Sequence, residues 1–161
     1  KQSNEHQFKI SKIKNTMGLR FFTVYGPWGR PDMALFTFAN KIVAGEPIDI
    51  YNYGDMKRDF TYVDDIVQGI FGLLDQIPEG DEIFNIGYGK QVGLMEFITE
   101  IEKNLGRVAE KNFLPMHPAD SKETWSDTSK LYNLTGYNPK TSVVDGVKEF
   151  IDWYKSYYKV N

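Results

Sequence analysis

A buried strand that runs directly into a loop rich in glycine and proline is the feature that most constrains this fold. Residues 19–24 are mostly apolar, aromatic or β-branched, which is typical of a buried strand, and the Tyr-Gly-Pro-Trp-Gly-Arg-Pro run after them ends it abruptly. In open α/β sheets, ligands bind just beyond the carboxyl ends of strands. The sequence therefore predicts a small-molecule site here, with Thr23, Tyr25 and Arg30 as hydrogen-bonding groups. A surface turn is the alternative.

The composition is that of an ordinary globular chain. Of its 161 residues, 41% are hydrophobic and 25% are charged, enough to form a sizeable core. A net charge of −3 argues against a nucleic-acid-binding surface, which normally carries a basic excess. The chain has no cysteine, which excludes disulfides and thiolate metal sites and is compatible with a reducing cytoplasm. Without an apolar run of about 18 residues, no membrane partner is expected.

Strand and helix patterns alternate along the chain, which predicts an α/β fold. Helices are expected over 32–44, 64–74, 94–105 and 129–134 and from Ser142 onward, with Asp32, Asp64 or Asp65, and Ser142 as their N-terminal caps. Strands are expected over 17–24, 48–53, 58–63, 83–86 and 113–116. The segments 48–53 and 58–63 are expected to pair as a ribbon across the turn at Gly54-Asp55.

Three further features favour structural roles. The Gly-rich loop at residues 87–93 lacks the spacing of a Walker or dinucleotide fingerprint, which favours an ordinary strand-to-helix connection over a phosphate cradle. His117 has no second ligand at a plausible spacing, so a loop residue is favoured over a metal ligand. Asp127 is expected to cap the helix that follows it. No metal site is predicted.

The chain resembles the NAD-dependent epimerase/dehydratase family of extended short-chain dehydrogenases/reductases, and within it most closely the UDP-glucuronate 4-epimerases. The motifs that carry this resemblance are TVYGPWGRPDMA (23–34), IDIYNYG (48–54), KRDFTYVDD (57–65), FNIG (84–87), WSDTSK (125–130) and TGYNPKTS (135–142). The resemblance implies that residues 17–161 are the C-terminal substrate-binding portion of an extended Rossmann-type epimerase. Strands 17–24 and 83–86 would belong to the Rossmann sheet, and residues 1–16 would be a remnant of the helix after the catalytic motif.

The family reaction, as the resemblance implies it, needs NAD, a tyrosine acting as acid and base on the sugar 4-hydroxyl, and a lysine four positions later. It passes through a 4-keto intermediate that is reduced from the other face. The sequence contains no Gly-rich fingerprint, and Tyr-x-x-x-Lys occurs only at Tyr53–Lys57, in a predicted turn rather than on a helix. Lys1 opens a Lys-Gln-Ser-Asn-Glu string that resembles the family's motif lysine, the alternative being a disordered terminus. The chain alone is therefore expected to be inactive.

Two arginines and a threonine are candidate ligands of the substrate. The resemblance implies that Arg58 contacts the pyrophosphate, for which guanidinium geometry is well suited, the alternative being a surface ion pair. It also implies that Thr23 binds a sugar carboxylate or hydroxyl, although a β-branched residue at a strand end is the competing explanation. Arg30 would face the cleft, or else be an exposed arginine stacked on Trp28.

Other residues are implied in nucleotide and cofactor contacts. Ile50 and Tyr51 would flank the uracil ring, or else belong to the core. Asp120 would approach the nucleotide, although Ala119 replaces the usual glycine before it and the arginine usual just upstream is absent. The segment Tyr25, Gly26 and Pro27 would lie against the nicotinamide end of NAD through backbone groups.

The sequence thus predicts the substrate-binding half of an NAD-dependent epimerase that converts UDP-glucuronate to UDP-galacturonate for capsule or other polysaccharide synthesis. The complete enzyme is expected to be a cytoplasmic homodimer with a UDP-sugar as its partner. A dehydratase or decarboxylase of the same family, or a non-catalytic nucleotide-sugar binding module, are the alternatives.

Overall fold

The computed structural model describes residue 5, residues 14–118 and residues 120–160. The elements are β1 Met17–Phe21, β2 Thr23–Tyr25, α2 Ala34–Ala44, β3 Ile48–Ile50, the 3₁₀ turn η1 Tyr51–Gly54, β4 Lys57–Arg58, β5 Phe60–Tyr62, α3 Val63–Leu74, β6 Glu82–Ile86, β7 Val92–Gly93, α4 Leu94–Leu105, β8 Lys111–Phe113, α5 Ser129–Thr135 and α6 Val143–Tyr158.

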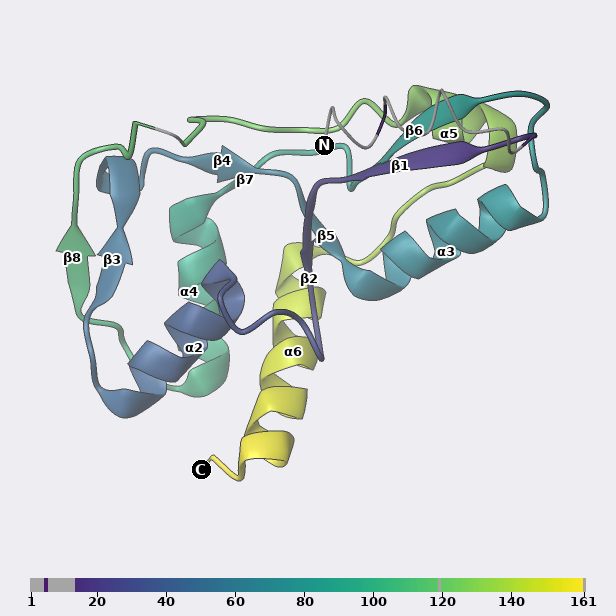
Figure 1. Ribbon diagram of the computed structural model, residues 1–161. Helices are drawn as coiled ribbons and strands as arrows, with labels where there is room; N and C mark the ends of the chain where they lie inside the picture. The colour runs from purple at the N-terminus through teal and green to yellow at the C-terminus, as the bar shows by residue number, and fades with distance from the viewer. Residues whose placement is uncertain (1–4, 6–13, 119, 161) are drawn as a thin grey trace.

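These elements form two groups. One group comprises α2, α4, α6 and the β3–β8 pair, and a second comprises α3, α5 and the β1–β6 pair (Figure 1). Strands β2, β4, β5 and β7 lie where the groups meet (Figure 1).

The strand predicted over residues 17–24 is two strands with different partners. β1 pairs in parallel with β6, and β2 pairs in parallel with β5. The change occurs at Phe22, whose amide donates to the Ile86 carbonyl at 3.3 Å, whereas the Thr23 amide donates to the Asp59 carbonyl at 3.1 Å. This switch brings Thr23 beside the Lys57–Tyr62 segment. The strand expected at 83–86 is confirmed as β6.

The ribbon predicted from residues 48–53 and 58–63 is wrong. β3 pairs in parallel with β8, β5 pairs with β2, and β4 pairs antiparallel with β7. Tyr51–Gly54 is a 3₁₀ turn rather than strand, and Asn52 and Tyr53 have φ angles of 49° and 53°. Alternation indicates that a segment is extended but not which segment it pairs with. The last predicted strand begins earlier than expected and ends at Phe113.

The predicted helices are confirmed, but two of their caps are wrong. Ser142 does cap α6, because its hydroxyl accepts from the Asp145 amide at 3.1 Å. Asp32 instead pairs with Arg30, and α2 begins at Ala34. α3 begins at Val63, so Asp64 and Asp65 lie inside its first turn. No helix in the described ranges is long and apolar enough to cross a membrane.

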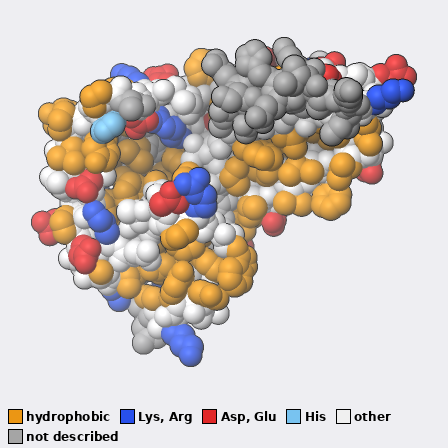
Figure 2. Space-filling view, in the orientation of Figure 1, with side chains coloured by type: hydrophobic (Ala, Val, Ile, Leu, Met, Phe, Trp, Pro, Cys, Tyr) orange, Lys and Arg blue, Asp and Glu red, His pale blue; other side chains and the backbone are white. Residues whose placement is uncertain are grey.

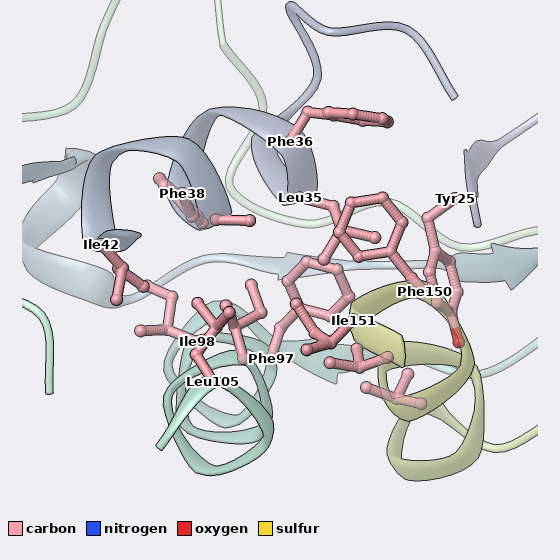
Figure 3. Packing of buried hydrophobic residues seen from close by; sticks show 14 of the residues in the cluster. Tyr25, Leu35, Phe36, Phe38, Ile42, Phe97, Ile98, Leu105, Phe150 and Ile151 are labelled. Atoms are coloured by element: carbon pink, nitrogen blue, oxygen red, sulfur yellow. The ribbon is translucent and has the colours of Figure 1, made fainter. Parts of the chain in front are cut away.

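Two apolar cores hold the strands in place, including β5, which follows Arg58. In the larger core, side chains from α2, α4 and α6 interdigitate around Phe97 and Phe150 (Figure 3). Phe60 of β5 stacks on Phe97 with ring centroids 4.0 Å apart, which attaches β5 to α4. The smaller core lies among α3, β6 and α5 and includes Phe84 and Leu131. The segment carrying Arg58 is therefore anchored by the packing of β5.

Candidate functional site

The Arg-Asp-Phe-Thr segment sends alternate side chains to two different environments. Arg58 and Phe60 line a cleft, whereas Asp59 and Thr61 are fully buried on the other side. This separation follows from the period of two in extended backbone. One short segment thus supplies both a cationic cleft residue and a buried carboxylate.

Hydrogen bonds fix the Arg58 guanidinium in place. Its Nη1 donates to the carbonyls of Lys57 and Lys122 at 2.9 and 3.1 Å, and its Nη2 donates to Asp120 Oδ1 at 2.6 Å. The Arg58 side chain is 17% exposed. A guanidinium carries five N–H donors, and the hydrogen bonds to described residues do not use all of them. The remaining donors are available to a ligand. The arrangement suits an anion that approaches from the cleft.

The buried Asp59 carboxylate ties together the segments around the site. It accepts from the amides of Tyr88, Gly89 and Ser126 at 2.8, 3.0 and 2.9 Å. The hydroxyls of Thr61 and Ser126 also donate to it, at 2.9 and 2.6 Å. Two amides of the Gly-rich loop therefore bind a carboxylate of the protein itself, consistent with a connection rather than a phosphate cradle.

One cleft gathers four of the predicted substrate-binding residues: Thr23, Tyr51, Arg58 and Asp120. Its volume is about 260 Å³, and its remaining lining is mostly apolar. A second hollow of about 640 Å³ adjoins it, because Thr23 and Arg58 line both. Among the described residues the Thr23 hydroxyl has no hydrogen-bond partner. The apolar residues of the first cleft are Met33, Ala34, Phe38, Met56, Phe60 and Leu94.

Arg30 lies outside this cleft. Its side chain is 74% exposed and makes a bidentate ion pair with Asp32. Hydrogen bonding to this guanidinium lowers the pKa of the Asp32 carboxyl. The arginine is exposed, as the alternative interpretation held, and it pairs with Asp32, while Trp28 packs against Trp153 and Tyr157 at centroid distances of 5.1 and 5.0 Å.

Two predicted contact residues place their side chains in the core. Ile50 is fully buried, which is the alternative that the sequence left open. Tyr25 is 5% exposed, and its ring points toward α6 (Figure 3). Burial raises the pKa of the Tyr25 hydroxyl. The Tyr25 side chain is therefore not available to a cofactor, the predicted backbone contact of Tyr25, Gly26 and Pro27 with NAD stays a prediction, and Lys1 lies outside the described residues.

The remaining predicted features have local roles. The His117 ring meets the exposed Tyr51 ring edge-on, with centroids 6.4 Å apart. Within the ranges that the structure describes, no group of three metal-ligating side chains comes together. Asp127 was predicted to cap α5 but lies one residue before its N-cap, Thr128, and its carboxylate accepts from the Ser129 amide and hydroxyl at 3.0 and 2.6 Å.

Sequence reasoning missed two residues near the site. Asp59 was detectable in principle, because the alternation that directs Arg58 to one face directs its neighbour to the other. Lys122 gave no signal: it lies in a polar loop and reaches Arg58 through its backbone carbonyl. Such a contact depends on tertiary structure alone.

Comparison with known proteins identifies the family. Residues 7–87, half of the chain, match the family model described as the NAD dependent epimerase/dehydratase family. The chain belongs to this family. Protein CapI of Staphylococcus aureus is 45% identical over 179 residues, covering 99% of this chain and 54% of that protein. The probable UDP-glucuronate 4-epimerase of Rhizobium meliloti is 42% identical and covers 98% of this chain and 50% of that protein.

A solved epimerase structure shares the fold of this family member. The crystal structure of UDP-glucuronic acid 4-epimerase from Bacillus cereus, in complex with UDP-glucuronic acid and NAD, superposes with a TM-score of 0.90 at 37% identity. The match covers 98% of this chain and 52% of that one. The predicted α/β epimerase fold is thereby confirmed. The chain spans about half the length of the curated relatives it matches.

Proposed function

We propose that this protein is the substrate-binding half of an NAD-dependent UDP-glucuronate 4-epimerase. The observation that carries the proposal is the convergence of Thr23, Tyr51, Arg58 and Asp120 on one cleft. The similarity to a structure that binds UDP-glucuronic acid and NAD supports it. The same resemblance supports polysaccharide synthesis as the process, the cytoplasm as the location, and a homodimer as the state of the complete enzyme.

In this proposal the cleft residues bind and orient the UDP-sugar. Arg58 holds a phosphate oxygen with the N–H donors that Lys57, Lys122 and Asp120 leave free. The Thr23 hydroxyl donates to the sugar carboxylate or a sugar hydroxyl. Tyr51 offers an aromatic face to the base. These contacts restrict the sugar's orientation, which is the contribution of binding groups to rate.

Among the described residues, one segment is proposed to contact the NAD cofactor. At the end of β2, Gly26 has a φ of 141°, and a Cβ there would lie 2.8 Å from Val63 Cγ1. Val63 therefore requires a glycine at this position, and the proposed contact of the Tyr25, Gly26 and Pro27 backbone with the nicotinamide is supported by the family resemblance. NAD, when bound, supplies reversible hydride transfer at the sugar C4. This chain's own residues hold the sugar in place.

Calorimetric titration with UDP-glucuronate, UDP-glucose and UDP tests the binding site. Arg58→Gln should weaken the affinity for all three about tenfold or more, because it removes a charge-assisted contact to phosphate. Lys148→Gln is the matched control, since Lys148 pairs with Asp152 on the exposed surface of α6. Equal affinity in wild type and Arg58→Gln would contradict the assignment, as would a wild-type chain that binds none of the ligands.

We further propose that these 161 residues alone do not epimerise, because the sequence lacks a helical Tyr-x-x-x-Lys motif and a Gly-rich fingerprint. Incubation with NAD and UDP-glucuronate, followed by NMR of the sugar anomeric protons, should show no UDP-galacturonate. Formation of UDP-galacturonate would overturn this part of the proposal. A decarboxylated product would instead indicate the decarboxylase, and a 4-keto-6-deoxy product from a parallel incubation with UDP-glucose would indicate the dehydratase.

A further inference from the structure

Residues 122–124 form a short parallel ladder with Lys57. The Lys57 amide donates to the Lys122 carbonyl at 3.0 Å, and the Thr124 amide donates to the Lys57 carbonyl at 3.2 Å. The side chains of Lys57 and Glu123 pair on one side of this ladder, at 3.8 Å. Because side chains alternate along extended backbone, Lys122 belongs to the opposite side, with Arg58. Thr124, which shares this side with Lys122, lines the larger hollow together with Arg58, whereas the Lys122 side chain lines neither hollow and pairs with Asp55.

These two cations are held very differently. The Arg58 side chain is 17% exposed and fixed by several acceptors, whereas the Lys122 side chain is 53% exposed. Among the described residues the Lys122 ammonium pairs with Asp55 Oδ2 at 2.7 Å, and the Asp55 side chain is 64% exposed. Exposed pairs of this kind contribute little to stability, and the four-carbon stem of lysine is flexible. Lys122 can therefore leave Asp55 at little cost.

The charges that line the cleft are compatible with a second cation beside Arg58. Asp120 Oδ1 lies 2.6 Å from Arg58 Nη2, so the two groups form an ion pair, and a second carboxylate, Asp49, also lines the cleft. A bridging diphosphate carries two negative charges, so one arginine already paired with a carboxylate is a weak match for it. The hydrogen bond to Asp55 raises the pKa of Lys122, which therefore stays charged near neutral pH. The Lys122 side chain is charged and exposed, and the Lys122 backbone carbonyl accepts a hydrogen bond from Arg58.

We propose that Lys122 is the second phosphate-binding cation of the cleft, exchanging Asp55 for a phosphate oxygen when a nucleoside diphosphate binds. This inference rests on the proposed function, because it assumes that the anion beside Arg58 is a phosphate. The ligand class is a nucleoside diphosphate or its sugar ester, with the two phosphates shared between Arg58 and Lys122. Asp55 then acts as a stand-in anion that holds the lysine nearby in the free protein.

Calorimetric titrations with UDP, UMP and uridine test this exchange. Lys122→Gln should weaken UDP binding about fivefold to tenfold and leave uridine binding unchanged, with a smaller effect on UMP. It should also flatten the dependence of UDP affinity on salt concentration, because one fewer charge contributes. Asp55→Asn should leave UDP affinity unchanged or raise it, since it removes the competing anion. Lys148→Gln should behave like wild type.

The outcomes separate this inference from the proposed function. If Arg58→Gln weakens UDP binding and Lys122→Gln does not, the site stands and the role of Lys122 is overturned. If Asp55→Asn weakens UDP binding as much as Lys122→Gln, the ion pair only supports the loop, and the exchange is also overturned. A wild-type chain that binds no UDP overturns both. Thermal melting of each variant, expected within a few degrees of wild type, checks that the fold is intact.

Discussion

At the scale of single residues, the buried Asp59 carboxylate shows how much of the site depends on one side chain. Its two oxygens serve five donors from the amides and hydroxyls of neighbouring segments. Asp59→Asn would turn an NH₂ group toward some of these donors and leave them unpaired. We expect a loss of roughly 3 kcal/mol in the free energy of unfolding, measured by urea denaturation. Asp152→Asn, at an exposed position, should change it by less than about 0.5 kcal/mol.

Tyr25 gives a residue-scale prediction about pH. Burial raises the pKa of the Tyr25 hydroxyl well above its ordinary value of about 10, so the folded state keeps the phenol protonated where the unfolded chain loses its proton. The contribution of the protonated Tyr25 hydroxyl to the free energy of unfolding is therefore complete below about pH 10. Above that pH the free energy of unfolding falls by up to about 1.4 kcal/mol per pH unit. Urea denaturation between pH 8 and 11 should show a shallower decline for Tyr25→Phe. The exposed Tyr132→Phe should keep the wild-type slope, and equal slopes in all three proteins would refute the argument.

At the scale of elements, helices could be predicted because their signals are local, and strand pairing could not. Ser142 caps α6 through the Asp145 amide three residues away, so sequence alone identified it. The prediction of a ribbon was wrong because β3 pairs with β8 and β5 pairs with β2. These partners are distant in sequence, and the alternation of a strand does not identify its partner. Likewise, four of the predicted site residues line one cleft, whereas the contacts of Asp59 and of the Lys122 carbonyl arise only from tertiary structure.

Asp65 illustrates a tertiary contact that replaces a predicted local cap. It is 2% exposed, and its two carboxylate oxygens accept from the Lys140 and Thr141 amides at 3.1 Å each. These bonds join α3 to the segment that leads into α6. Asp65→Ala should lower the free energy of unfolding by about 2 kcal/mol and speed hydrogen exchange at those two amides. Asp64→Ala is the control, and unchanged exchange at Lys140 and Thr141 in Asp65→Ala would disprove the link.

At the scale of the whole molecule, the second group of elements presents an apolar surface. Val67, Phe71 and Leu74 follow helical spacing on α3, Ile77 lies just beyond, and these four side chains are 42%, 62%, 53% and 56% exposed. Hydrophobic side chains gather over the part of the surface where β1 and α3 lie (Figure 2). A contiguous apolar stripe on a soluble domain marks an interaction surface, whereas scattered apolar residues do not.

We therefore expect the isolated chain to self-associate through this stripe. Sedimentation velocity over a range of concentrations should show a species larger than the monomer that grows with concentration. Phe71→Glu should weaken the association about tenfold, because a charge at the centre of an apolar contact must be desolvated, and 1.4 kcal/mol corresponds to that factor. Val108→Glu supplies the matched control, since Val108 is 87% exposed and lies outside α3. If Val108→Glu weakened association as much as Phe71→Glu, net charge rather than the α3 stripe would govern it.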